Sequence, residues 1–127
     1  MVKQLTVYKA SAGSGKTFTL AVEYIKLLVK NPQNYSHILA VTFTNKATEE
    51  MKMRILSQLY GISKQLPDSN NYMERIQEST GLSVQQVSER AGIALHLLLH
   101  NYNYFRVETI DTFFQSVLRN LARELDL

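Results

Sequence analysis

The residues with the clearest chemical potential lie near the start of the chain, where residues 10–17 read ASAGSGKT. This stretch ends in the G-K-T of the phosphate-binding consensus G-x-x-x-x-G-K-[ST], with Ala10 in place of the first glycine. Gly13 and Gly15 allow backbone N–H groups to approach phosphate oxygens closely. Lys16 would neutralise the β and γ phosphates, and the Thr17 hydroxyl would hold Mg²⁺. The alternative is a glycine-serine turn that only joins two elements.

The elements around this loop decide between the two interpretations. Residues 4–9 (QLTVYK) are β-branched and aromatic and predict a strand. A helix with apolar residues at three- and four-residue spacing follows from Lys16 to Asn31, before Pro32. Residues 37–43 (HILAVTF) predict a strand that is buried on both faces, as in a parallel sheet. Strand, loop, helix and strand form a βαβ unit, which is the context that a phosphate loop requires.

The pattern of the remaining residues predicts that a helical segment interrupts this α/β domain. A second helix is expected at about residues 46–60, followed by a polar linker over residues 61–72. Ser83 and Gln86 have the spacing of a capping box and open another helix. Residues 105–110 (FRVETI) alternate like a strand, and Asp111 is a plausible cap for a last helix. That helix carries one apolar face, formed by Phe114, Leu118, Leu121 and Leu125. We therefore expect a partial α/β domain of residues 1–60 and 105–127, with a helical insert of residues 61–104.

Three stretches together resemble the opening motifs of superfamily 1 helicases of the UvrD/Rep type, and most closely the RecB/AddA-type helicase-nucleases. They are residues 10–28 (ASAGSGKTFTLAVEYIKLL), residues 38–55 (ILAVTFTNKATEEMKMRI) and residues 107–122 (VETIDTFFQSVLRNLA). The resemblance implies a P-loop NTPase of the RecA-like fold, in which the insert corresponds to the start of the 1B subdomain. It implies ATP and Mg²⁺ as cofactors, with Lys16 as the catalytic residue of the loop. The nucleotide-binding residues that it implies are Ala12, Gly13, Ser14, Gly15, Lys16 and Thr17.

The resemblance also implies that TFTNKA is motif Ia, a contact with single-stranded DNA. The residues concerned are Thr42, Phe43, Thr44, Asn45 and Lys46. They follow a predicted parallel strand, at the edge where open α/β sheets bind ligands. Phe43 is suited to stacking on a base, and its polar neighbours to donating hydrogen bonds to phosphate oxygens. Without the resemblance, Thr44 or Asn45 would be interpreted as a helix cap and Phe43 as a core residue.

The third stretch resembles a further DNA contact less closely. The family often has Thr-x-His-Ser-Phe where this chain has Thr109-Ile-Asp-Thr112-Phe. An aspartate would repel a phosphate, so Asp111 is expected to cap a helix rather than to bind DNA. Thr109 and Thr112 remain candidate DNA contacts.

The composition of the chain limits which classes of protein it can belong to. The chain has 127 residues, 45% of them hydrophobic, no cysteine and a net charge of +3. It is therefore suited to one globular domain without disulfides or thiolate metal sites. No apolar run reaches the roughly 18 to 20 residues that span a bilayer, so we expect a cytoplasmic protein without a membrane partner. The small positive charge permits a nucleic-acid partner without proving one.

No buried strand ending in Asp-Glu is recognisable, although nucleotide hydrolysis needs such an acid to hold Mg²⁺. We therefore expect the N-terminal part of a longer helicase, which alone binds nucleotide weakly and does not turn it over. Its partners would be single-stranded DNA and the second RecA-like domain. Uncovered strand edges and apolar helix faces predict that the chain self-associates. The alternatives are a small-substrate P-loop kinase or NTPase, and a nucleotide-binding interaction module.

His96 and His100 are four residues apart, the spacing that places two imidazoles on one helix face. No third ligand is evident nearby in sequence, so they are expected to be polar-face residues. The aromatic residues of NYNYF (residues 101–105) are expected to pack the insert onto the core rather than to stack on bases.

Overall fold

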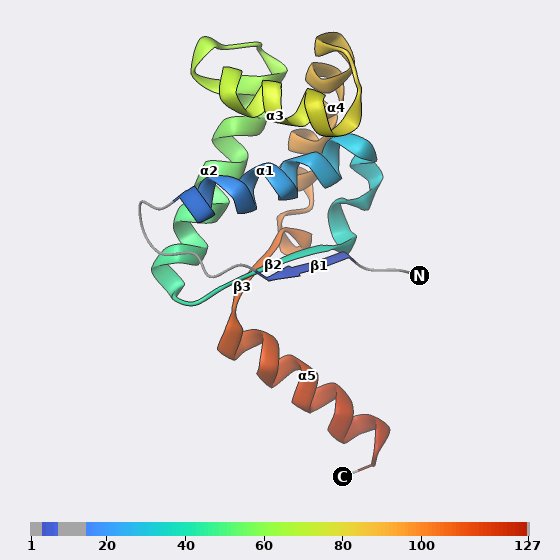
Figure 1. Ribbon diagram of the computed structural model, residues 1–127. Coiled ribbons are helices and arrows are strands. Elements are labelled where there is room, and N and C mark those ends of the chain that lie inside the picture. Colours follow the sequence, from blue (N-terminus) through green and yellow to red (C-terminus); the bar gives the residue numbers. More distant parts are fainter. Residues whose placement is uncertain (1–3, 8–14, 127) are drawn as a thin grey trace.

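The computed structural model describes residues 4–7 and 15–126, which form three strands and five α-helices joined by short 3-10 helices (Figure 1). The strands are β1 (Gln4–Val7), β2 (Ile38–Thr42) and β3 (Arg106–Thr109). The helices are α1 (Gly15–Lys30), α2 (Asn45–Ser63), α3 (Asn70–Thr80), α4 (Val84–His100) and α5 (Ile110–Glu124). The 3-10 helices are η1 (Pro32–His37), η2 (Pro67–Ser69) and η3 (Tyr102–Tyr104).

The strands form a parallel sheet in the order β1-β2-β3. Val7 is paired with Val41, and Thr42 with Thr109. Because the strands are parallel, all three end at the same edge of the sheet. The expected α/β class with a parallel sheet is therefore confirmed, and so is the return of the chain to the sheet after the helices that follow β2.

The core lies between the sheet and helices α1 to α4. Helix α1 buries one stripe at three- and four-residue spacing, and α4 contributes a second such stripe. The buried side chains of these two helices include Leu20, Tyr24, Ile25, Leu28, Val87, Ala91, Ala94 and Leu98. Tyr24 packs edge-on against Phe105, with 5.8 Å between the ring centroids. Burial raises the pKa of the Tyr24 hydroxyl above its ordinary range.

The expected polar linker of residues 61–72 is wrong in most of its length. Helix α2 continues to Ser63, and α3 already begins at Asn70. Asn70 to Tyr72 begin a helix whose apolar stripe continues beyond the expected linker, because Tyr72, Met73 and Ile76 are all buried against the core. Gly61 inside α2 allows the Ser69 side chain to approach closely, since a Cβ at position 61 would collide with its hydroxyl.

The expected cap of the last helix is also wrong. Thr109 is the N-cap of α5, and its Oγ1 accepts a hydrogen bond from the Thr112 N–H at 3.2 Å. Asp111 lies in the first turn instead, where its negative charge suits the helix dipole. Helix α5 then projects away from the other helices (Figure 1) and buries none of its residues. Among the described residues, no helix is long and apolar enough to cross a membrane.

Candidate functional site

The predicted phosphate-binding sequence runs from the segment after β1 into the first turn of α1. Ala12, Gly13 and Ser14 are outside the described residues, as is Ala10, but the strand before the loop and the helix after it are both present. Gly15 is the first residue of α1, so Lys16 and Thr17 lie in its first turn. The Lys16 side chain is exposed, whereas Thr17 is buried. The first turn of α1 has no acidic residue, so its N-terminal N–H groups and Lys16 present positive charge at this end.

The second candidate segment is the junction between β2 and α2. The Thr42 side chain, at the end of β2, is only 1% exposed. Its Oγ1 lies 2.6 Å from Oγ1 of Thr48, one turn into α2, and 3.4 Å from the carbonyl oxygen of Glu108 in β3. This buried hydroxyl pair fixes the start of α2 against the sheet. A direct DNA contact from the Thr42 side chain is not supported by this burial.

The next four residues, Phe43 to Lys46, are exposed at the same junction. Thr44 is the N-cap of α2, and its Oγ1 accepts a hydrogen bond from the Ala47 N–H at 3.0 Å. The interpretation of Thr44 as a cap is therefore confirmed, whereas Asn45 is the first helical residue and not the cap. Phe43 is 48% exposed and is not a core residue. An aromatic ring, an amide and an ammonium group thus surround the N-terminus of α2, whose first turn has no acidic residue.

The junction between β3 and α5 repeats this arrangement one strand further along. Besides capping the helix, the Thr109 hydroxyl donates a hydrogen bond to Oγ1 of Thr112 at 3.0 Å. Thr109 is partly buried and Thr112 is exposed. Because Thr42 and Thr109 are in register, the starts of α2 and α5 lie on the same edge of the sheet. The strand β1, which precedes the predicted phosphate loop in sequence, ends at this edge as well.

Acidic groups for metal-assisted hydrolysis are not assembled in the described part of the chain. There, no three His, Cys, Asp or Glu residues are grouped so that they could hold a metal ion. Glu108, an acid near this edge in β3, is paired with Arg106, whose Nη2 lies 3.0 Å from its Oε2. The other oxygen of Glu108 is buried and has no hydrogen-bond partner among the described residues.

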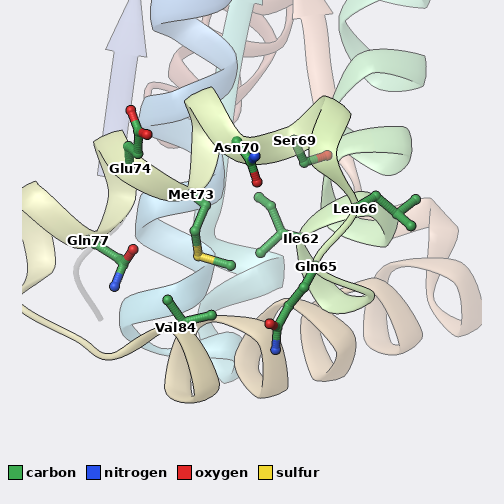
Figure 2. A pocket seen from close by; sticks show the side chains of 10 residues that line it. Ile62, Gln65, Leu66, Ser69, Asn70, Met73, Glu74, Gln77 and Val84 are labelled. Carbon is green, nitrogen blue, oxygen red and sulfur yellow. The ribbon is translucent and has the colours of Figure 1, made fainter.

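A separate pocket of about 250 Å³ lies at the far end of α2. Figure 2 shows Ile62, Met73 and Val84 around it, with Gln65 and Glu74 at its margin. The sequence did not predict this pocket. Its walls come from α2, α3 and the start of α4, and a polar linker was expected where α3 begins. All of its lining residues lie between positions 61 and 84, and none belongs to the sheet edge that carries the candidate site.

Comparisons with known proteins place the chain in a family. Residues 2–127 match the UvrD/REP helicase N-terminal domain. The chain is 33% identical over 130 residues to the RecBCD enzyme subunit RecB of Escherichia coli, covering 91% of this chain and 10% of that protein. It is 30% identical over 118 residues to RecB of Borreliella burgdorferi, covering 93% of this chain and 10% of that protein. It is 33% identical over 101 residues to an ATP-dependent helicase/nuclease subunit of Clostridium novyi, covering 78% of this chain and 8% of that protein.

The chain therefore belongs to the UvrD/REP helicase N-terminal domain family, and its relatives are RecB and AddA-type helicase-nuclease subunits. The resemblance inferred from the three sequence stretches is confirmed. The chain spans about a tenth of the length of these relatives. No solved structure gives a significant match.

Proposed function

We propose that the chain is the N-terminal, ATP-binding part of an ATP-dependent DNA helicase or helicase-nuclease that acts on single-stranded DNA in repair or recombination. The observation that carries this proposal is the shared edge of the sheet. The phosphate-loop helix and the exposed Phe43 to Lys46 both follow strands that end there. Ligands at the two junctions would therefore lie on the same edge of the sheet, next to the paired strands β1 and β2.

Within this proposal, residues 1–60 and 105–127 form a partial RecA-like domain, and residues 61–104 begin the 1B subdomain. The nucleotide phosphates bind at residues 12–17. The Lys16 ammonium neutralises the β and γ phosphates, and the Thr17 hydroxyl holds Mg²⁺. The exposure of Lys16 and the absence of an acidic residue in the first turn of α1 support the role assigned to Lys16. The role of Thr17, whose side chain is buried, rests on the loop motif alone.

Single-stranded DNA binds across the junctions of β2 with α2 and β3 with α5. Phe43 stacks on a base, because half of its surface is exposed beside a helix N-terminus. Thr44, Asn45 and Lys46 donate to phosphate oxygens. Thr42 is assigned a positioning role, since its hydroxyl is buried against Thr48. Thr109 and Thr112 extend the contact weakly, because each already bonds to the other.

ATP turnover requires groups that the described residues do not assemble, and we propose that the rest of a helicase chain supplies them. The missing parts are the acid that holds Mg²⁺ and the second RecA-like domain. The 127-residue chain alone should therefore bind nucleotide without hydrolysing it.

Two substitutions in the 127-residue chain test the proposal. Binding of a fluorescent ATP analogue with Mg²⁺ and of a labelled oligo-dT are measured side by side. Lys16→Ala should weaken nucleotide binding at least tenfold and leave DNA binding within twofold. Phe43→Ala should weaken DNA binding by about five- to a hundredfold, which corresponds to one stacked base at ~1–3 kcal/mol.

Met53→Ala is the matched control, because Met53 is an exposed hydrophobic residue on α2 that lies outside its first turn. It should change neither affinity. Nucleotide binding in a chain with no affinity for oligo-dT would instead favour a small-substrate kinase or an interaction module. DNA binding that is equally strong in Phe43→Ala would contradict the assignment of the site.

A further inference from the structure

Two histidines on α4 form a cluster that the proposed helicase site does not use. His96 and His100 lie one turn apart near the end of the helix, and both side chains are exposed. Their ring centroids are 4.0 Å apart, and the rings are tilted by 36°. The spacing alone predicted a common face, and the structure brings the two rings into contact.

The opposite face of α4 is packed in the core and fixes the position of this pair. Ala91, Ala94 and Leu98 of α4 are completely buried in the core, which fixes the rotation of the helix and the direction of the face that carries the histidines. The Arg90 guanidinium donates to the carbonyl oxygens of Val29 and Lys30, both at 3.3 Å, and so fixes α4 against the end of α1. Little backbone ordering would therefore accompany the binding of a ligand by the two rings.

The electrostatic setting of the pair suits a cation. His100 is in the last turn of α4, where the helix dipole places partial negative charge. Between Arg90 and the end of α4, the sequence contains no Lys or Arg that would repel a cation from the same helix. A late first-row metal ion takes imidazole nitrogens at roughly 2.0–2.1 Å, so two nitrogens bound to one ion lie about 3 Å apart. Rings already in contact reach this arrangement by side-chain rotation alone.

We propose that His96 and His100 together bind one late first-row divalent cation. The two neutral imidazoles are the protein ligands, and water fills the remaining coordination positions. The order of affinity should be Cu²⁺ above Zn²⁺ and Ni²⁺, since the geometry of a two-ligand site imposes no selection of its own. This site is distinct from the Mg²⁺ proposed for Thr17, because Mg²⁺ prefers oxygen ligands.

A bound cation would stiffen the segment through which the insert returns to the sheet. The last turn of α4 leads through Asn101 to η3, and from there to Phe105 and β3. Both Nδ2 and the backbone N–H of Asn101 donate to the Leu97 carbonyl oxygen. Closing a chelate across the same turn would oppose fraying of this helix end, so binding should raise the melting temperature of the folded chain.

The test is a titration of the 127-residue chain with CuCl₂ and with ZnCl₂ in a non-coordinating buffer, followed by calorimetry and by thermal unfolding. We expect one equivalent of metal to bind and to raise the melting temperature. His96→Gln and His100→Gln should each weaken binding at least tenfold and abolish the thermal shift. His37→Gln should change neither quantity, since the histidine ring contact joins His96 with His100, whereas His37 belongs to η1.

A double variant controls for the number of histidines. His96→Gln with Ser79→His keeps the histidine count but moves one ring to an exposed position on α3. It should bind as weakly as His96→Gln alone. Far-UV circular dichroism checks that each variant is folded. We expect all of them to fold, because none of the substituted residues is buried. Binding that is unchanged in His96→Gln or His100→Gln, or as strong in the double variant as in the parent chain, would overturn the proposal.

Discussion

Helices α2 and α5 begin in nearly the same way and differ in how much of their length is enclosed. Each starts at the carboxyl end of a parallel strand, and each is capped by a threonine hydroxyl that accepts from the N–H three residues later. Helix α2 buries Met51, Ile55, Leu59 and Ile62 in the core. Helix α5 also has an apolar stripe, which includes Phe114, Leu118 and Leu121, yet these side chains are about half exposed and none of its residues is buried.

The difference shows that a cap and an amphipathic pattern place the start of a helix without determining what its apolar face contacts. Helix α2 is enclosed because α4 and α1 pack along it, whereas α5 projects from the edge of the sheet (Figure 1). The exposed stripe of α5 is the physical basis for the expected self-association, which stays a prediction. Three sets of substitutions separate the two helices experimentally.

The largest difference should come from truncating one apolar side chain in each helix. Ile55→Ala removes a completely buried side chain of α2 and should lower the free energy of unfolding by about 2–5 kcal/mol, since it leaves a cavity. Leu118→Ala in α5, where the side chain is 62% exposed, should change it by no more than about 0.5 kcal/mol. Urea unfolding followed by circular dichroism measures both. Equal losses would mean that α5 is covered in solution.

The buried hydroxyl pair of Thr42 and Thr48 should give an intermediate effect. Thr42→Val leaves the Thr48 hydroxyl without its partner and should cost about 1–3 kcal/mol of unfolding free energy. The double variant Thr42→Val with Thr48→Val should recover most of this loss, because both ends of the bond are then apolar. Additive losses in this double-mutant cycle would show that the two hydroxyls do not interact.

The smallest effects should come from the caps. Thr44→Ala and Thr109→Ala each remove one cap and should each cost about 1 kcal/mol of helix stability. In α2 this loss should appear in global unfolding, because the helix is part of the core. In α5 it should appear only as faster amide hydrogen exchange in the first turn, with the urea midpoint unchanged. Thr44→Ser and Thr109→Ser keep the hydroxyl and serve as controls. A midpoint shift in Thr109→Ala would show that α5 is coupled to the core.

Much of the fold could be predicted from local patterns. Apolar spacing predicted α1, the capping box of Ser83 and Gln86 predicted the start of α4, and both ends of that capping box are hydrogen-bonded. The helix α3 was missed because it has only three buried residues, Tyr72, Met73 and Ile76, and all its other residues are polar. Their burial becomes evident only from packing, such as the contact of Tyr72 with Phe18. Asp111 was wrongly expected to be the cap of α5, because the identity of the N-cap depends on where β3 ends, and β3 runs to Thr109.

The candidate site was predictable only in part. The resemblance to superfamily 1 helicases, and not the residue types alone, indicated a contact surface at the β2–α2 junction. Phe43 to Lys46 are exposed there, and the DNA contact itself stays a prediction. The inward direction of Thr42 was not predictable, since it depends on the hydroxyl of Thr48 and on the neighbouring strand β3. The roles assigned to Ala12, Gly13 and Ser14 concern positions outside the described residues and stay predictions.

The order of the strands also bears on how the chain reaches its folded state. Strands β1 and β2 are joined by one helix, but three helices separate Thr42 from its partner Thr109. Pairing of β3 therefore depends on contacts between residues far apart in sequence, which form slowly unless something shortens the search. Packing of α4 against α2 brings Phe105 back to the sheet, so the helices between β2 and β3 should fold first and act as a template for the last strand.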